Sequence, residues 1–216
     1  EMILHVYDLA TKSNVGDVLV ATPDKIIFDL IKKNGGNSFL SQNHSETGTD
    51  RVFEAFEKFY LSKPEIIINL QGDMPNMDPN DIVRLRDYLK SNKCQIGTLA
   101  SKIEDENEIK DKNVVKVLTG KTIENLDFSE AFDFKREVGE EDTKLLYHHI
   151  GIYGFTKEAL MRYVKLKRSK LEVERNLEQM RAMENKIKIH VGFTHSKPLG
   201  VDTEEDLLKI KKIMEN

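Results

Sequence analysis

The stretch Ile66-Ile67-Ile68-Asn69-Leu70-Gln71-Gly72-Asp73-Met74-Pro75 decides how the chain folds. It begins as a run of β-branched apolar residues and ends in a polar turn that contains glycine. A short apolar run bounded by turn residues predicts a buried parallel strand, here one that carries Asp73 to its carboxyl end. Ligands bind at this end of open α/β sheets, so Asp73 is a candidate metal ligand. The alternative is that Asp73 only turns the chain or caps the helix that begins near Pro79.

Helical patterns and short apolar runs alternate along residues 1–90. Apolar residues at helical spacing predict helices from Met2 to Ala10, from Pro23 to the stop at Asn34-Gly35-Gly36, from Thr47 and from Pro79. Strands are expected at Asp17–Ala21 and Asn37–Ser41. This alternation predicts a parallel sheet whose strands are joined by right-handed crossovers.

The second half of the chain is less regular. Longer strands are expected at Gln95–Lys102, Asn113–Leu118, Thr122–Phe128, Leu145–Phe155 and Lys186–Phe193. Helices are expected at Lys157–Val164, at Lys170–Glu184 and after Thr203, which suits an N-cap. The charged stretch Ser129–Thr143 has no period and is expected to be a loop or weak hairpin. No repeat or linker divides the chain, so a single domain over residues 1–216 is predicted.

Composition limits the classes of function. The 216 residues include 33 basic and 37 acidic side chains, a net charge of −4, and 39% of them are hydrophobic. These values are typical of a globular protein and give no support to nucleic-acid binding through overall charge. No apolar run is long enough to span a membrane. The single cysteine, Cys94, excludes an intrachain disulfide and is expected to be a buried, inert thiol. A cytoplasmic protein that binds neither nucleic acid nor membrane is therefore predicted.

A second acidic turn, Leu199-Gly200-Val201-Asp202-Thr203, precedes the last expected helix. If this turn meets the first one at an edge of the sheet, Asp73 and Asp202 make a site with two carboxylates. Mg²⁺ suits such a site, because it takes one or two carboxylates together with substrate phosphates. The alternative for Asp202 is an ordinary helix start.

Three further segments carry polar groups that suit a ligand. The segment Tyr147 to Tyr153 is expected to be a strand, so its adjacent histidines point to opposite faces and cannot serve one metal ion. The segment Leu177 to Arg181 alone is typical of an amphipathic helix face. The segment Ser45 to Arg51 is a hydroxyl-rich turn into a helix, whose free amides and basic side chain suit a phosphate or a hydroxylated ligand. The alternatives are a structural histidine, and an N-cap whose arginine pairs with an acidic neighbour.

Together and in this order, the motifs resemble the 3-deoxy-manno-octulosonate cytidylyltransferases, also called CMP-Kdo synthetases, over essentially the whole chain. The matching residues are Val20-Ala21-Thr22, Gly35-Gly36, Thr47-Gly48-Thr49-Asp50-Arg51, Asn69-Leu70-Gln71-Gly72-Asp73-Met74-Pro75, His149-Ile150-Gly151-Ile152-Tyr153, Leu177-Glu178-Gln179-Met180-Arg181, and Gly200-Val201-Asp202-Thr203-Glu204-Glu205-Asp206-Leu207. Each motif alone is weak, whereas QGD-x-P, HxGIY, LEQ-x-R and VDT-x-EDL in succession are specific.

The resemblance implies an α/β fold of the Rossmann-like nucleotidyltransferase type. Such a fold has a mostly parallel central sheet flanked by helices, with a smaller mixed sheet region in the second half. The resemblance also implies an enzyme that transfers CMP from CTP to the anomeric hydroxyl of 3-deoxy-D-manno-octulosonate (Kdo), an acidic sugar of lipopolysaccharide, and releases pyrophosphate. The alternatives are transfer to another acidic sugar, such as 8-amino-Kdo or a nonulosonate, and a non-catalytic module that binds nucleotide or sugar.

The same resemblance implies roles for individual residues. Asp73 and Asp202 match the catalytic aspartates that bind Mg²⁺, and Arg51 lies in a motif near the nucleotide. The positions that match the family's sugar-binding residues are Gln71, His149, Glu178 and Gln179. Family members are commonly homodimers, and an unpaired strand between Leu118 and Phe134 is a candidate interface.

Three features depart from the family pattern. The family begins with a strand and a basic phosphate-binding turn that would precede residue 1. An incomplete chain is therefore expected rather than an enzyme without a central strand. Met74 stands where many members have glutamate, and Glu130 stands where they have arginine.

Overall fold

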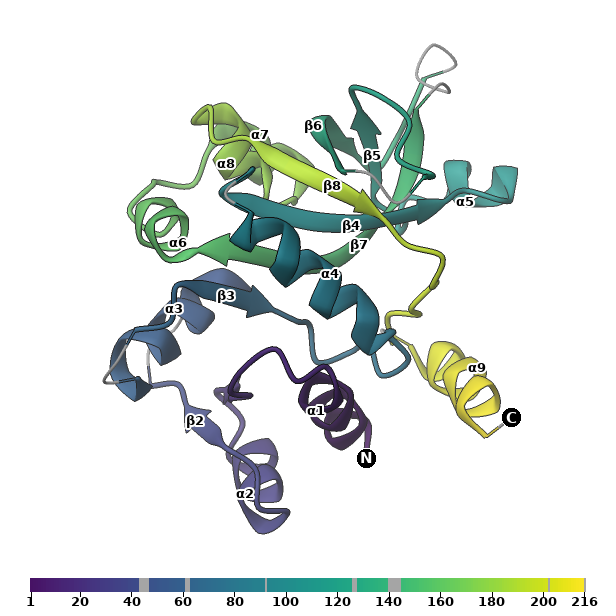
Figure 1. The fold of residues 1–216 in the computed structure, drawn as a ribbon. Coiled ribbons are helices and arrows are strands. Elements are labelled where there is room, and N and C mark those ends of the chain that lie inside the picture. Colours follow the sequence, from purple (N-terminus) through teal and green to yellow (C-terminus); the bar gives the residue numbers. More distant parts are fainter. Residues whose placement is uncertain are drawn as a thin grey trace. The chain divides into compact units, whose positions relative to one another are not determined.

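The computed structural model describes residues 1–42, 47–60, 63–91, 93–125, 128–139, 145–201 and 203–215 (Figure 1). The chain divides into two compact units. Unit 1 comprises Glu1–Pro64, Asn69–Arg84 and Pro198–Asn216, and unit 2 comprises Glu65–Ile68 and Leu85–Lys197. The expectation of a single domain over residues 1–216 stays a prediction.

Unit 1 contains a two-stranded parallel sheet, β1 (Val20–Thr22) with β2 (Ser38–Leu40). Its helices are α1 (Met2–Lys12), α2 (Lys25–Lys33), α3 (Gly48–Phe59), residues 79–84 of α4 (Pro79–Lys90), and α9 (Glu204–Met214). Short polar side chains accept backbone N–H groups at three of the helix starts. These caps are Asp24 on α2, Thr47 on α3 and Thr203 on α9. They explain why the predicted helices begin where they do.

Unit 2 is built on a mixed sheet of six strands in the order β3-β7-β4-β8-β6-β5. The strands are β3 (Ile66–Asn69, whose last residue belongs to unit 1), β4 (Ile96–Lys102), β5 (Lys116–Thr119), β6 (Phe128–Lys135), β7 (Leu146–Thr156) and β8 (Ile189–Phe193). β4 is parallel to β8 and antiparallel to β7, and these three run side by side in Figure 1. The mixed region is therefore larger than expected, because the long strand β7 enters antiparallel to β4.

The sheet of unit 2 also closes on itself. β5 pairs with β6 and with the start of β7, and β6 pairs with β5 and β8, in each case antiparallel. The expectation of an unpaired strand between Leu118 and Phe134 was wrong. Where these pairings run, the backbone groups of β5 and β6 are already hydrogen-bonded and are not available to a second subunit.

Helices cover this sheet at several places. The helices wholly within unit 2 are α5 (Glu106–Lys110), α6 (Lys157–Tyr163), α7 (Lys170–Arg175) and α8 (Met180–Glu184). The second half of α4 lies against β4 and β7, because its buried Leu85 and Leu89 pack close to Gly97 and Gly154. The helix predicted to begin at Pro79 is confirmed.

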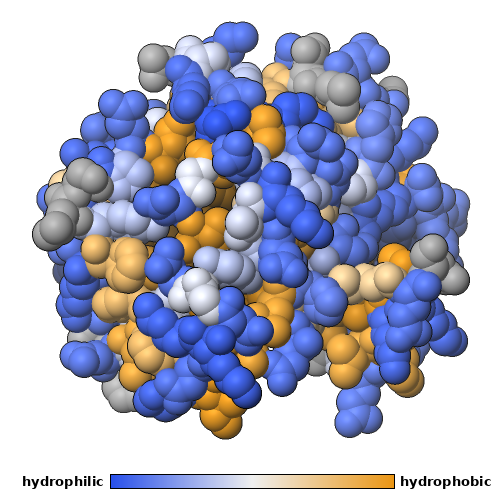
Figure 2. Space-filling model, turned by 60° about the horizontal axis from the view of Figure 1, so that its bottom comes forward, coloured by the Kyte–Doolittle hydropathy of each residue, from blue (hydrophilic) through white to orange (hydrophobic). Residues whose placement is uncertain are grey.

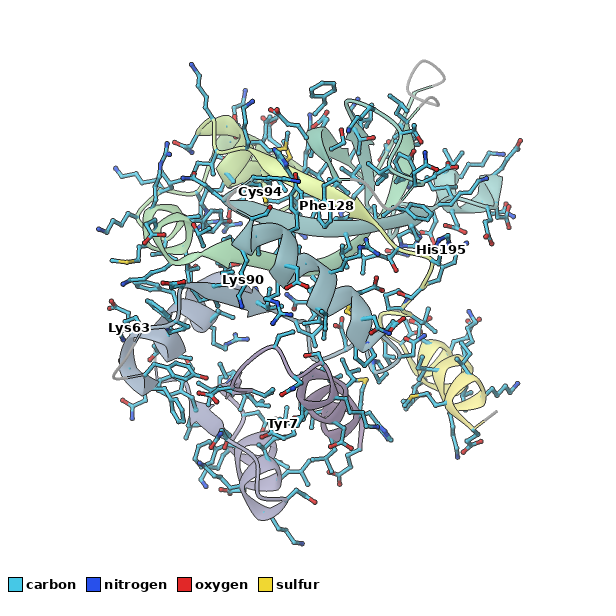
Figure 3. All side chains as sticks on the ribbon, viewed as in Figure 1. Tyr7, Lys63, Lys90, Cys94, Phe128 and His195 are labelled. Carbon is cyan, nitrogen blue, oxygen red and sulfur yellow. The ribbon has the colours of Figure 1, made fainter. Side chains whose placement is uncertain are left out.

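Two strand predictions were wrong around residue 128. Residues 122–125 form a turn and coil instead of a strand. Ser129 to Lys135, expected to be a loop or weak hairpin, form most of β6, a regular strand of the sheet. The charges that hid this strand have partners elsewhere in the unit: Glu130 pairs with Lys188, and Asp133 pairs with Arg175. The ring of Phe128, at the start of β6, covers Gly192 of β8 (Figure 3).

The helix predicted from Lys170 to Glu184 is broken in the structure. Asn176 adopts the left-handed conformation with φ 51° and ψ 48°, which asparagine tolerates better than most residues, and ends α7. The Leu177 N–H donates to the Glu172 carbonyl at 3.2 Å. Glu178 and Gln179 therefore lie in the turn before α8 rather than on a continuous helix face.

The surface is mainly hydrophilic in the view of Figure 2, with apolar side chains scattered across it. The large apolar residues that are exposed include Ile26, Phe59, Phe132, Val173, Leu207, Leu208, Ile213 and Met214. In the part of the chain that the structure describes, no helix has the length and apolar character needed to cross a membrane.

Replacing Gly154 with alanine is expected to lower the free energy of unfolding by about 1–3 kcal/mol, because inserting a methyl group into a packed core forces its neighbours apart. A Cβ at Gly154 would lie 2.3 Å from Leu89 Cδ1 and 3.0 Å from Ile68 Cδ1. Urea denaturation measures the change. Gly16→Ala is the control, since nothing lies within 4 Å of a Cβ at that position. Equal stability of the two variants would contradict the packing described for α4.

Candidate functional site

Two acidic turns meet in unit 1. The Val201 N–H donates to the carbonyl of Asp73 at 3.1 Å, and the Leu199 N–H donates to Asn76 Oδ1 at 3.0 Å. These bonds join the end of β3 to the segment before α9, although the two segments are distant in the sequence. Asp202 lies outside the described residues, but its neighbours Val201 and Thr203 are described on either side of it.

The half-buried Asp73 lies next to Gly200. A Cβ at that glycine would come to 3.9 Å from Asp73 Oδ2. Among the described residues, no group of three or more histidine, cysteine, aspartate or glutamate side chains is arranged to hold a metal ion. A carboxylate such as that of Asp73 fits an ion that takes few protein ligands and completes its coordination with substrate oxygens, as Mg²⁺ does.

The start of α3 lies against the same turn. A Cβ at Gly48 would lie 3.7 Å from Gln71 Nε2, and the Asn69 amide is 3.5 Å from the buried Thr49 hydroxyl. Arg51, one turn into the helix, has a buried Nε with no hydrogen-bond partner among the described residues. The predicted residues Arg51, Gln71 and Asp73 thus share unit 1, with the helix start next to the turn after β3.

The remaining predicted residues lie in unit 2. His149, on β7, is half-buried, and its Nε2 lies 3.0 Å from the Thr98 hydroxyl on β4. Its neighbour His148 faces the other way and contacts Glu108 at 3.0 Å, which confirms that the two histidines lie on opposite faces. Burial, with a contribution from His148, lowers the pKa of His149 to about 3. His149 is therefore neutral at physiological pH and cannot act there as a cation.

Tyr153 belongs with this group, although the sequence analysis gave it no role. Its ring centre lies 5.4 Å from that of His149, and its buried hydroxyl lies close to the Thr98 hydroxyl. Burial and the charge of Glu178 raise its pKa well above the ordinary value, so the hydroxyl stays protonated and is a donor. The sequence contained a signal for this residue, because positions i and i+4 of a strand lie on one face.

The turn that carries Glu178 and Gln179 is held from two sides. The Tyr163 hydroxyl donates to the Glu178 carbonyl at 2.8 Å. The buried guanidinium of Arg181 binds the buried carboxylate of Glu172 through two bonds of 2.8 and 2.6 Å, which joins α8 to α7. Glu178 is half-buried and Gln179 is 8% exposed. The shape of this turn thus depends on groups that are themselves shielded from solvent.

The free energy of unfolding is expected to fall as the pH drops below 6.5, in part because of His149. The unfolded chain binds a proton at this residue near pH 6.5, whereas the folded chain binds it only near pH 3. One such group contributes at most about 1.4 kcal/mol per pH unit, and the partial exposure of the ring keeps its share smaller. Urea denaturation at pH 7, 6 and 5 should therefore show a shallower loss for His149→Gln. Identical pH dependence in the two proteins would contradict the lowered pKa.

Cys94 provides no nucleophile for this site. It lies just before β4 (Figure 3), is 8% exposed, and has its pKa raised to about 12 by burial. A thiol with such a pKa carries almost no thiolate at neutral pH. The prediction of a buried, inert cysteine is confirmed.

Comparisons with known proteins agree with the motifs. A family model described as cytidylyltransferase matches residues 1–189. The 3-deoxy-manno-octulosonate cytidylyltransferase of Thermodesulfovibrio yellowstonii is 39% identical, with 99% of this chain and 88% of the relative covered, and that of Bartonella bacilliformis is 35% identical, with 99% and 87% covered.

Solved structures show the same relationship. A structure of CMP:2-keto-3-deoxy-manno-octonic acid synthetase complexed with CTP has a TM-score of 0.87 and 31% identity, with 99% of this chain and 87% of the other covered. An apo UDP-glucose pyrophosphorylase has a TM-score of 0.70 at 11% identity, with 99% and 86% covered, and shares the fold alone. The predicted nucleotidyltransferase fold is confirmed.

Proposed function

This chain belongs to the cytidylyltransferase family, and on that premise we propose that it transfers CMP from CTP to the anomeric hydroxyl of Kdo. The hydroxyl oxygen attacks the α-phosphorus of CTP, the bond to the β-phosphate oxygen breaks, and pyrophosphate leaves. The product, CMP-Kdo, serves lipopolysaccharide synthesis. The relatives that carry this activity in their names cover nearly all of this chain, and the solved synthetase with CTP has a closely similar fold.

The observation that carries the proposal is the hydrogen bond between the two acidic turns. Because the Val201 N–H binds the Asp73 carbonyl at 3.1 Å, the chain segment next to Asp202 lies beside the QGD motif. If the two acidic motifs served only as helix caps, they would not need to lie next to each other. The contact therefore supports a shared role for Asp73 and Asp202.

We assign that role to Mg²⁺ binding. Asp73 and Asp202 would hold the ion next to the triphosphate, with Val201, the neighbour of Asp202, bonded to the Asp73 carbonyl. When bound, Mg²⁺ neutralises charge on the phosphate oxygens and on the leaving pyrophosphate. Phosphoryl-type transfer depends mainly on such neutralisation and on positioning, so the reaction needs no covalent intermediate and no protein nucleophile.

The protein's own polar side chains would position the two substrates. Arg51 and the amides at the start of α3 suit a phosphate or ribose oxygen, as helix N-termini do. Gln71, His149, Glu178 and Gln179 supply donors and acceptors for a polyhydroxylated acid, and Tyr153 adds a hydroxyl donor. His149, Tyr153 and Glu178 are each half-buried.

Pyrophosphate release from CTP, Kdo and Mg²⁺ tests the proposed reaction directly. Kdo should be used with a higher kcat/KM than 8-amino-Kdo or a nonulosonate at the same CTP concentration. A higher kcat/KM with 8-amino-Kdo or a nonulosonate would identify that sugar, rather than Kdo, as the substrate. Binding of CTP or Kdo without turnover would favour a non-catalytic module.

We also propose that the protein is a cytoplasmic homodimer. A single cysteine that is buried and unable to form an intrachain disulfide suits a reducing compartment. Phe132 on β6 is 66% exposed, and an exposed aromatic residue on a paired strand suits contact with a second subunit. Light scattering of the purified protein gives the mass, and Phe132→Ser should lower it from that of a dimer toward that of a monomer. A monomeric wild type would reject the dimer.

A further inference from the structure

The Thr98 hydroxyl is the centre of a small hydrogen-bond system between β4 and β7. Its Oγ1 lies 2.6 Å from the Ile152 carbonyl, 3.2 Å from the Ile150 carbonyl and 3.0 Å from His149 Nε2. Thr98 itself is fully buried. Water therefore does not compete for any of these bonds.

These hydrogen bonds form because the register between β4 and β7 shifts at this point. Thr98 pairs with Tyr153, but the next residue, Leu99, pairs with Ile150, so residues 151 and 152 of β7 have no opposite residues on β4. Such a bulge re-aims side chains and frees backbone carbonyls from the ladder. The Thr98 hydroxyl lies at this bulge and donates to the carbonyl of Ile152, one of the two residues without an opposite residue on β4.

The position of the hydroxyl proton follows from the partners. A carbonyl oxygen carries no proton, so a contact of 2.6 Å between Thr98 Oγ1 and the Ile152 oxygen requires the threonine proton to lie between them. The hydroxyl has one proton, and it therefore presents a lone pair to His149. A hydrogen bond of 3.0 Å to Nε2 then requires the proton to be on Nε2.

We propose that Thr98 is a positioning residue that holds His149 as the neutral tautomer protonated on Nε2. In this tautomer Nδ1 carries the lone pair and is an acceptor. No described residue forms a hydrogen bond with Nδ1, so this acceptor is available to a ligand.

The tautomer limits the groups that His149 can bind. That His149 binds the sugar at all rests on the proposed function. A neutral Nδ1 acceptor binds a hydroxyl donor and gains nothing from a carboxylate, which has no proton to donate. The geometry thus assigns His149 to a hydroxyl group of the sugar, while the sugar carboxylate must find its partner elsewhere. The lowered pKa of His149 agrees with this assignment, because the ring stays neutral when the acid binds.

Replacing Thr98 tests the inference through steady-state kinetics. In Thr98→Val the side chain keeps its shape and loses the hydroxyl, so the KM for Kdo should rise about fivefold, the worth of one hydrogen bond, while the KM for CTP stays within about twofold. Thr98→Ser keeps the hydroxyl and should restore the KM for Kdo. Thr119→Val is the matched control, since the Thr119 hydroxyl is equally buried and donates to the Lys121 carbonyl at 2.8 Å, away from His149.

Nitrogen NMR of the histidine rings tests the tautomer without any substrate. The wild-type signals that disappear in His149→Gln should show a protonated Nε2 and an unprotonated Nδ1. Thr98→Val should convert part of that population to the other tautomer, whereas Thr119→Val should not.

These measurements distinguish a failure of the proposed reaction from a failure of the positioning role of Thr98. A wild type that releases no pyrophosphate with Kdo rejects the proposed function. An active wild type whose His149 carries its proton on Nδ1 rejects the positioning role, and so does an unchanged KM for Kdo in Thr98→Val. A similar rise in that KM for Thr119→Val would assign the effect to lost stability and also reject it.

Discussion

Asp73→Asn is expected to lower the rate of pyrophosphate release from CTP and Kdo by about a thousandfold or more, since it removes a charge that we propose holds Mg²⁺ against the triphosphate. The substitution keeps the size of the side chain. It also keeps the backbone carbonyl that accepts the Val201 N–H, so the fold of the turn should survive. The measurement is coupled detection of pyrophosphate at saturating substrates over a range of Mg²⁺ concentrations. The concentration of Mg²⁺ at half-maximal rate should rise for any activity that remains.

Asp78→Asn provides the matched control for this experiment. Asp78 lies on the same loop, is exposed, and accepts the backbone N–H of Asn80 through an oxygen that asparagine retains. Its rate should stay within about twofold of wild type, because a surface charge of this kind is screened by solvent. Equal rates for Asp73→Asn and the wild type would remove Asp73 from the catalytic set, whatever its sequence motif.

Arg181→Leu is expected to lower the free energy of unfolding by about 3–5 kcal/mol, because it leaves a buried carboxylate without its partner. In the wild type, Glu172 and Arg181 are almost wholly buried and joined by two hydrogen bonds. Guanidinium and carboxylate are removed from water together, and each satisfies the other. Without Arg181, the charge of Glu172 keeps only the Ser169 N–H and the more distant Arg168. Urea denaturation at pH 7 measures the loss.

The loss should depend on pH in a defined direction. Burial alone would raise the pKa of Glu172, but the bonds from Arg181 and the Ser169 N–H outweigh it and lower the pKa below 4.5. A lowered pKa contributes stability above the unfolded value, and that stability is lost as the pH falls through the folded value. In Arg181→Leu the effect of burial on Glu172 dominates instead. The folded variant is therefore stabilised when Glu172 takes up a proton. The difference between the two proteins should therefore be largest near pH 7 and shrink as the pH approaches 4.5.

Arg168→Leu is the control for that prediction. Arg168 also contacts Glu172, at 3.3 Å, but its side chain is 43% exposed, so its removal should cost less than about 1 kcal/mol. Equal losses for the two variants would show that the cost does not come from burying an unpaired charge.

Much of the fold could be predicted from the sequence where local signals were strong. The apolar run 66–68 between polar turns predicted β3, and Thr47 and Thr203 predicted the starts of α3 and α9, because a threonine hydroxyl satisfies a free amide of the first turn. Such caps act within three residues. Helix starts of this kind can therefore be predicted from the sequence alone.

Local signals failed where distant groups decide the conformation. β6 contains Glu130 and Asp133, which hide the strand pattern, and their partners Lys188 and Arg175 come from much later in the chain. The break after α7 depends on the left-handed conformation of Asn176, which a helical apolar spacing from Leu171 to Met183 conceals. In both places tertiary pairing outweighed the local preference.

The sequence by itself determined the family and the strand β3 that precedes Asp73, and it predicted the residues that we propose bind Mg²⁺ and the sugar. Only the tertiary structure decided that Val201 meets Asp73, that the turn of Glu178 rests on Tyr163 and a buried ion pair, and that His149 is neutral beside Thr98. The physical reason is distance along the chain. Helix caps and apolar runs are interactions between neighbours, whereas a pKa, a tautomer or a hydrogen bond between turns depends on groups that only folding brings together.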